Sequence, residues 1–360
     1  MAVYAWVKQN IQNNTFKSGE KLISENKLCE KFSISRPTAR QAIALLEKEN
    51  LVIRKRGSGT FVNHPIIKKQ TTSKTIGLLM TYIDGYIFPD FISGVEQVLS
   101  KHSYHMALRL TSNQIQNERQ QLLSFLDMDI DGLIVEGVKS ALPNPNLELY
   151  QQLYNRHIPV IFINSYYPTL DCNYILNDDY IGGRLATRHL IENGHKKIAI
   201  IFKHDDLQGT LRYKGFLDEM YDQHLEVNES FIFWYSTESY EQLFRPEHLL
   251  LLIDKLRECS AAVCYNDQLV FRLIPFLTQA KLNIPKDLSI TSFDNSSVND
   301  LASVPLSSVT HPGEELSKLA TTSLLTMIEN PHFEIKHVYQ PSIIIRDSVQ
   351  PYVPKHCNKD

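Results

Sequence analysis

Residues 182–202, GGRLATRHLIENGHKKIAIIF, decide the fold of the larger part of this chain. GGRLATRHLIENG has the character of a helix, and KKIAIIF (196–202) is a short apolar run that suits a buried strand. The run before them, IPVIFIN (158–164), is also strand-like. The order is therefore strand, helix, strand, which is the rhythm of a parallel sheet covered by helices.

The same rhythm extends in both directions from this stretch. Before it come TIGLLMTYI (75–83), the helical DFISGVEQVLSKHSY (90–104), MALRLTS, NERQQLLSFLDM and DGLIVEG; after it come RYKGFLDEMYDQH, FIFWYS, SAAVCYND, LVFRLIPFLTQAKL and LSITSFDN. About twelve alternating elements exceed one doubly wound domain, so residues 75–360 are predicted to form two similar lobes with a ligand cleft between them. We expect lobe one at about 75–165 plus 305–329, and lobe two at about 166–304 plus 330–350.

Residues 1–62 have a different pattern. Residues 2–13 carry an apolar stripe at helical spacing, Ser24 is placed to cap a short helix, and Ser35 is placed to cap the next one. LVIRKRGSGTFV (51–62) suits two short strands with a glycine-containing tip. Helix, helix-turn-helix and hairpin together predict a winged helix, which residues 63–74 join to the rest as a linker.

Charge separates the two parts. Residues 1–62 hold 11 Lys and Arg against 5 Asp and Glu, whereas the rest of the chain holds 26 against 35. A basic head on an acidic body favours contact of the head with a polyanion. Arg and Thr on the first turn of the second helix suit a major groove, and the cations of the hairpin tip suit phosphates or a minor groove. The residues predicted to contact DNA are Ser35, Arg36, Thr38, Arg40, Arg54, Arg56, Gly57, Ser58, Gly59 and Thr60.

Polar and aromatic side chains follow several predicted strands of the body. Carboxylates and amides share the hydrogens of sugar hydroxyls, arginine donates, and aromatic rings cover the apolar face of a sugar. Because the ends of parallel strands meet at one edge, such residues predict a sugar site. The strand-end and loop residues of this kind are Tyr86, Phe88, Glu136, Asn164, Arg212, Asn266, Asp267 and Asp294. Asp178-Asp179 and Asp205-Asp206 are interpreted as helix caps.

Other classes of protein have little support. The start of the chain lacks a signal peptide, no apolar run is long enough for a bilayer, and the five cysteines are scattered. This favours a cytoplasmic protein with reduced thiols, no membrane contact and no metal site. No GxxxxGK[ST] or GxSxG motif occurs, so we expect no enzyme and no cofactor, although a sugar kinase or a pyridoxal-phosphate enzyme with a winged-helix head stays an alternative. A transport receptor is a third alternative, which the basic head argues against.

Motifs in both parts resemble known families. SENKLC (24–29), SRPTARQAI (35–43) and GSGTFV (57–62) resemble the GntR family, and IDGLIVEG, RYKGF, AAVCYND, IPKDLSITSFDNS and LSSVTHP resemble the effector domain of LacI/GalR repressors. The combination is similar to the arabinose repressors of Gram-positive bacteria. That resemblance implies a homodimer that binds operator DNA and is released by a sugar, with arabinose first and another sugar as the alternative. It implies effector contacts at Tyr86, Phe88, Glu136, Asn164, Gln208, Arg212, Asn266, Asp294 and His311, with Tyr265 and Lys139 as weaker candidates.

Overall fold

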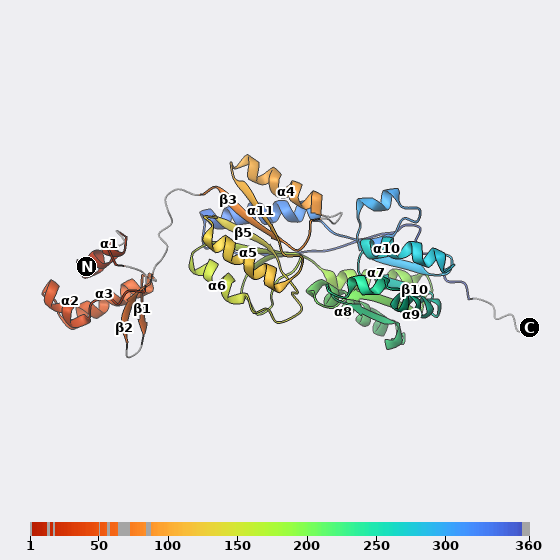
Figure 1. The fold of residues 1–360 in the computed structure, drawn as a ribbon, viewed down its shortest axis with the longest axis horizontal. Helices are drawn as coiled ribbons and strands as arrows, with labels where there is room; N and C mark the ends of the chain where they lie inside the picture. Colours follow the sequence, from red (N-terminus) through yellow and green to blue (C-terminus); the bar gives the residue numbers. More distant parts are fainter. Residues whose placement is uncertain are drawn as a thin grey trace, which may run out of the picture. The chain divides into compact units, whose positions relative to one another are not determined.

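The computed structural model describes residues 2–12, 15–16, 19–49, 51–55, 58–63, 73–83 and 88–354. The chain divides into two compact units, made chiefly of residues 1–72 and of residues 73–360, which we call the head and the body. Figure 1 labels their elements in chain order. Among the described residues, no helix has the length and apolar character that a membrane span requires.

The head has the predicted elements. Three helices, α1 (Ala2–Gln12), α2 (Glu25–Phe32) and α3 (Arg36–Lys48), precede an antiparallel hairpin of β1 (Val52–Lys55) and β2 (Gly59–Val62). One apolar stripe from each helix meets in a small core, because residues three and four apart lie on the same helix face. The fully buried members include Val7, Ile11, Leu28, Ala39, Ile43 and Leu46.

The two predicted helix caps differ in the head. Ser24 caps α2 as expected, since its side chain accepts a hydrogen bond from the backbone N–H of Lys27 at 3.3 Å. Ser35 occupies the capping position of α3 but makes no side-chain bond to the helix backbone. Its hydroxyl lies 2.9 Å from the hydroxyl of Thr38 instead, so the predicted position was right and the predicted capping bond was wrong. Pro37 is accommodated in the first turn, where backbone N–H groups have no helical partner.

The first lobe of the body is a six-stranded parallel sheet with the order β13-β7-β6-β5-β3-β4. Helices lie on both of its faces, with α4 and α11 together on one side and α5 and α6 on the other (Figure 1). The elements are β3 (Thr75–Met80), α4 (Phe88–Lys101), β4 (His105–Leu110), α5 (Ile115–Asp127), β5 (Gly132–Glu136), α6 (Leu147–Asn155), β6 (Val160–Ile163), β7 (Asn173–Asn177), α11 (Gly313–Glu329) and β13 (Lys336–Tyr339).

The second lobe repeats this architecture with the order β14-β12-β11-β10-β8-β9. Only β14 runs antiparallel to its neighbour among the described strands of this sheet. The elements are α7 (Asp179–Glu192), β8 (Ile198–Lys203), α8 (Leu207–Asp222), the 3-10 turn η1 (Glu229–Phe231), β9 (Ile232–Tyr235), η2 (Tyr240–Phe244), α9 (Pro246–Arg257), β10 (Ala261–Cys264), α10 (Asp267–Gln279), β11 (Ser289–Asp294), η3 (Ser297–Leu301), β12 (Ser307–Thr310) and β14 (Ile343–Ile344).

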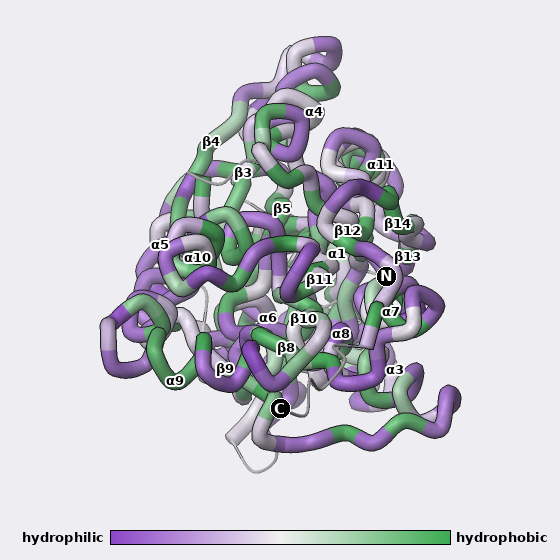
Figure 2. Tube along the Cα trace, turned by 90° about the vertical axis from the view of Figure 1, so that its right-hand side faces the viewer, coloured by the Kyte–Doolittle hydropathy of each residue, from purple (hydrophilic) through white to green (hydrophobic). Residues whose placement is uncertain are grey.

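Strand β8 illustrates why its sequence is almost uniformly apolar. Ile198, Ile200 and Phe202 pack against α7 and α8, whereas the alternate residues Ala199 and Ile201 pack against α9 and α10. A strand covered on both faces has no solvated side, so it reads as a continuous apolar run. Figure 2 shows this hydrophobic character along the central strands β5, β8 and β10.

The chain crosses between the lobes three times, after β7, after β12 and after β13. The predicted lobe boundaries were therefore wrong at three strands. Residues 173–177 and 336–339 belong to the first sheet, and residues 307–310 belong to the second. A strand of four or five residues carries no local signal of the sheet that it joins, because edge pairing of the backbone decides this.

Candidate functional site

The head exposes one polar face of α3. Arg36, Thr38 and Arg40 are exposed, on the opposite side of the helix from the buried Ala39 and Ile43. The guanidinium of Arg40 donates to a carboxylate oxygen of Glu25 at 2.9 Å, and its side chain remains 66% exposed. A duplex phosphate or base edge can therefore reach these side chains without any change in the core.

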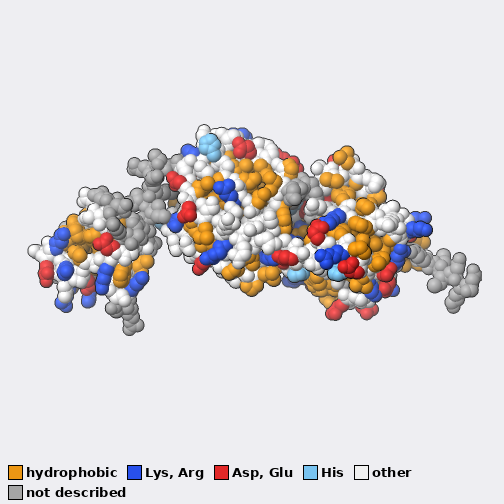
Figure 3. Space-filling view, viewed as in Figure 1, with side chains coloured by type: hydrophobic (Ala, Val, Ile, Leu, Met, Phe, Trp, Pro, Cys, Tyr) orange, Lys and Arg blue, Asp and Glu red, His pale blue; other side chains and the backbone are white. Residues whose placement is uncertain are grey.

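The hairpin continues this face. Arg54 is exposed and donates to the backbone oxygen of Arg40 at 3.3 Å, which ties β1 to α3. Ser58 and Gly59 are exposed, and Thr60 is partly buried. Gly59 adopts a φ of +116°, a conformation that side-chain-bearing residues rarely adopt. Figure 3 shows Lys and Arg side chains on the viewed face of the head. The predicted contacts Arg56 and Gly57 lie outside the described residues.

The body contains a cavity of about 730 Å³ between its lobes. The sheet order reverses between β3 and β5 in the first lobe and between β8 and β10 in the second, and the cavity is lined by residues that follow these four strands. Such switch points are where open parallel sheets bind ligands. The lining residues are Thr81, Tyr82, Phe88, Ser112, Asn113, Glu136, Gly137, Asn164, Lys203, Asp206, Gln208, Arg212, Tyr235, Thr237, Tyr240, Glu241, Tyr265, Asn266, Gln268, Arg272, Asp294 and His311.

The structure brings most of the predicted effector residues together. The lining includes Phe88, Glu136, Asn164, Gln208, Arg212, Asn266, Asp294 and His311, and also the weaker candidate Tyr265. Tyr86 lies outside the described residues. Lys139 does not line the cavity, because its ammonium group pairs with Glu238 at the rim. Contact of the lining residues with an effector stays a prediction.

The first-lobe wall is built around Glu136. Its carboxylate accepts hydrogen bonds from the backbone N–H of Thr81 at 2.9 Å, from the hydroxyl of Thr81 and from the side-chain amide of Asn164 at 3.0 Å. Asn164 and Asp294 have φ values of 59° and 92°, and Asn and Asp tolerate this left-handed region better than most residues do. The backbone therefore turns sharply where each strand ends at the cavity.

His311 lies at the second crossing between the lobes. Its Nε2 is 3.0 Å from Oδ1 of Asn164, so in the neutral ring Nε2–H donates and Nδ1 is an acceptor. Nδ1 is buried and makes no hydrogen bond in the described part of the chain. Burial, and then the nearby guanidinium of Arg212, lower the pKa of His311 to about 4. The imidazole is therefore neutral near pH 7, with Nδ1 a buried acceptor.

The second-lobe wall is built around Arg212, which is only 4% exposed. Its Nε donates to Asp179 at 2.7 Å, its Nη1 donates to the backbone oxygen of Tyr265 at 2.5 Å, and its Nη2 lies 3.9 Å from Asp294. The guanidinium also lies 4.2 Å from the ring centre of Phe293. Burial opposes the charge of Arg212, but the carboxylates outweigh this effect and raise its pKa. Arg212 is thus a fixed cation.

Lys203 and Asp206 form the second charged pair of this wall. The ammonium group lies 3.1 Å from Asp206 and 3.4 Å from Asp205. Burial alone would lower the pKa of Lys203, but Asp206 and Asp205 raise it. Asp206 also accepts a bond from the hydroxyl of Tyr265 at 2.6 Å and caps α8, as predicted for this aspartate pair. In the same way, Asp178 caps α7.

Comparison with known proteins identifies both parts of the chain. Residues 1–62 match the family of bacterial regulatory proteins of the gntR type, and residues 187–349 match the periplasmic binding protein-like domain. The arabinose metabolism transcriptional repressor of Geobacillus stearothermophilus is 37% identical over 96% of this chain and 97% of its own length. The chain belongs to the same repressor family. The corresponding repressor of Halalkalibacterium halodurans is 34% identical over 96% of each chain.

Solved structures agree with this assignment of the fold. A periplasmic binding protein/LacI transcriptional regulator from Alkaliphilus metalliredigens, crystallised with D-xylulofuranose, superposes with a TM-score of 0.65. It is 25% identical and covers 77% of this chain and 99% of its own. The predicted fold, a GntR winged helix followed by a periplasmic-binding-protein-like body, is confirmed. The protein is a DNA-binding transcriptional repressor and not an enzyme, which confirms that prediction as well.

Sequence reasoning missed several cavity residues of this repressor. Lys203 ends β8, so the strand-end argument that identified Glu136 applied to it equally. Thr237 and Tyr240 had no such signal, because they lie on a turn and a 3-10 helix after an edge strand. Arg272 lies in the second turn of α10, where its sequence position resembles that of a solvated helix face. Within the described residues, no cluster of His, Cys, Asp or Glu is arranged to hold a metal ion.

Proposed function

We propose that the protein is a cytoplasmic, homodimeric repressor whose head binds operator DNA and whose body binds a small neutral sugar, with L-arabinose the first candidate. The observation that carries this proposal is the composition of the cavity, which combines hydroxyl, amide and carboxylate groups with the rings of Tyr235, Tyr265 and Phe88. A sugar needs such a set, because its hydroxyls must be paired when they leave water. The names of the two relatives support arabinose, and the sugar bound in the solved relative supports a small carbohydrate.

The charges of the cavity favour a neutral sugar over a sugar phosphate. Each cation of the described lining is paired: Lys203 with Asp206, Arg212 with Asp179, and Arg272 with Glu241 at 2.6 Å. A phosphate would find no unneutralised cation among these residues, and it would meet the carboxylates of Glu136 and Asp294. Helix N-termini can also bind phosphate, but those of α8 and α10 at this cavity are already capped by the side chains of Asp206 and Asn266.

Sugar binding would control the head through the angle between the lobes. A ligand shifts a conformational equilibrium only by its difference in affinity for the two states. A sugar that contacts both Glu136 of the first lobe and Arg212 of the second binds the closed state more tightly. Closure would change the spacing of the two heads of a dimer, which must match half-sites about 34 Å apart or a multiple of that distance.

The test combines calorimetry with DNA release. L-arabinose, D-xylose, D-ribose, D-galactose and L-arabinose 5-phosphate are titrated into the full chain. Each is then added to its complex with a fluorescent duplex that the protein has selected from a random library. We expect a free pentose to bind and to lower the anisotropy, and the phosphate to do neither. Absence of any effect of the free sugars on DNA binding would contradict the proposal.

A further inference from the structure

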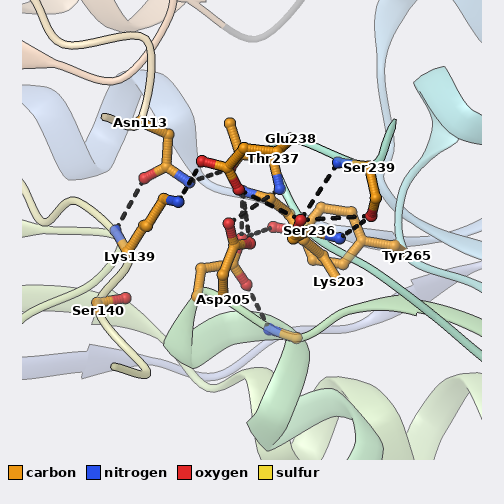
Figure 4. A network of polar contacts seen from close by, with 12 residues as sticks. Asn113, Lys139, Ser140, Lys203, Asp205, Ser236, Thr237, Glu238, Ser239 and Tyr265 are labelled. Carbon is orange, nitrogen blue, oxygen red and sulfur yellow. Dashed lines mark hydrogen bonds and ion pairs between the residues drawn. The ribbon is translucent and has the colours of Figure 1, made fainter. Parts of the chain in front are cut away.

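The rim of the cleft, on the side away from the crossings, carries a set of bonds that join the two lobes directly. The side-chain amide of Asn113 donates to the hydroxyl of Thr237 at 2.6 Å. The ammonium of Lys139 pairs with Glu238, and the amide of Gln114 donates to the same carboxylate at 3.1 Å. We call these residues, with Ser140 and Leu207 described below, the clasp. Figure 4 shows Lys139 and Asn113 pointing toward the turn that holds Thr237 and Glu238.

The first-lobe half of the clasp is held in place by its own lobe. The backbone N–H of Lys139 donates to Oδ1 of Asn113 at 2.9 Å, and the neighbouring N–H of Val138 donates to the hydroxyl of Tyr167 at 2.7 Å. That hydroxyl donates in turn to Glu118, which is fully buried. The same carboxylate accepts from Tyr150, Asn144 and Asn146, so the loop after β5 is fixed at several points.

The second-lobe half is fixed as well. The backbone N–H of Ser236 donates to the hydroxyl of Ser239 at 2.8 Å, and that of Ser239 donates back to Ser236 at 3.2 Å. The backbone N–H of Thr237 donates to Asp205 at 2.9 Å. Two surfaces that are already ordered lose little conformational entropy when they meet, so their contacts stabilise closure more than flexible side chains would.

The clasp also reaches the helix that carries Arg212. The backbone N–H of Leu207, the first residue of α8, donates across the cleft to the hydroxyl of Ser140 at 2.9 Å. The first N–H groups of a helix have no partner within the helix, so this first-lobe hydroxyl completes a second-lobe helix. Asn113 and Thr237 line the cavity, but Lys139, Ser140, Leu207 and Glu238 do not, and each bond of the clasp joins two protein groups directly.

We propose that the contacts of the clasp stabilise the closed conformation of the body without a sugar. They thereby set the fraction of body domains that is closed before any ligand binds. The effect of the clasp on sugar affinity rests on the proposed function; its effect on closure does not. A ligand that binds only the closed state has an apparent Kd equal to its intrinsic Kd divided by the closed fraction, so the clasp sets the sugar concentration at which the repressor responds. Partly exposed ion pairs such as Lys139–Glu238, where Glu238 is 52% exposed, are screened by salt, so closure is salt-dependent.

The test is hydrogen exchange of the full chain without sugar, read at the Leu207 amide by fragmentation mass spectrometry. Opening frees this N–H, so we expect Glu238→Gln to raise its exchange rate about two- to fivefold, the effect of one exposed ion pair. The double variant Lys139→Glu with Glu238→Lys should restore the wild-type rate. The matched control is Glu258→Gln, which removes the Lys255–Glu258 pair of the same lobe at 2.9 Å and should leave Leu207 unchanged.

Equal exchange at Leu207 in wild type and Glu238→Gln would overturn the proposal, and so would failure of the charge swap to restore it. Calorimetry with L-arabinose then extends the test: Glu238→Gln should raise the apparent Kd by up to the same factor. If wild type binds none of the tested sugars, the proposed function fails, yet the exchange rates still decide the clasp.

Discussion

Replacement of Arg212 by alanine separates sugar binding from DNA binding. The side chain is buried among Asp179, the backbone oxygen of Tyr265 and Asp294. Its removal deprives the ligand of a charged donor, which is worth about 1.5–3 kcal/mol and therefore predicts a roughly 10- to 150-fold rise in the Kd for L-arabinose. The uncompensated buried carboxylates should also lower the free energy of unfolding, by about 3–5 kcal/mol.

Arg184→Ala is the matched control for this prediction. Arg184 bridges Glu219 and Asp222 at 2.8 and 2.5 Å, so its loss leaves Asp222 without a cation, whereas Glu219 keeps Arg188 at 2.7 Å. Arg184 does not line the cavity, so in Arg184→Ala the free energy of unfolding should fall while the Kd for L-arabinose stays unchanged. Calorimetry gives the Kd, urea unfolding gives the stability, and anisotropy with a selected duplex gives DNA affinity, which we expect within about twofold of wild type. Sugar affinity that is unchanged in Arg212→Ala, or reduced equally in Arg184→Ala, would refute the reasoning.

Three further predictions concern other parts of the chain. Arg40→Ala should weaken binding to the selected duplex by about 1–3 kcal/mol in anisotropy titrations, whereas Lys48→Ala at the far end of α3 should not; equal losses would contradict a specific contact. With a pKa of about 4 against 6.5 for an ordinary histidine, His311 binds its proton more readily in the unfolded chain, so stability falls as the pH drops from 6.5 to 4. Urea unfolding at pH 6.5 and at pH 4 measures this loss: the free energy of unfolding should fall by up to about 3 kcal/mol less in His311→Gln than in wild type. An equal fall in the two proteins would exclude this role of His311. Gly183→Ala should destabilise the body by about 1–3 kcal/mol, because a Cβ there would lie 2.2 Å from the backbone oxygen of Arg212; an unchanged urea midpoint would show that α7 and α8 can separate.

The fold and much of the cavity could be predicted because both depend on repeated local patterns. Doubly buried strands such as β8 leave a continuous apolar run, and the carboxyl ends of parallel strands bring residues such as Glu136 and Asp294 to one edge. Thr237 and Arg272 could not be found in this way, because tertiary packing alone brings them to the cavity. The lobe assignment of β13 failed for a related reason: four residues pair with whichever sheet edge lies beside them.

The three crossings between the lobes have a consequence for synthesis on the ribosome. The first sheet gains its edge strand β13 only after residue 336 has emerged, roughly 160 residues after β7, and the second sheet gains β14 later still. At about 5–20 residues per second, the first lobe waits about 10 to 30 s for its last strand. The head has no such dependence, because all its elements lie within residues 2–62. A nascent chain can therefore carry a completed winged helix while the edge of β7 is still unpaired, and translation arrest in this interval would leave that edge open to aggregation.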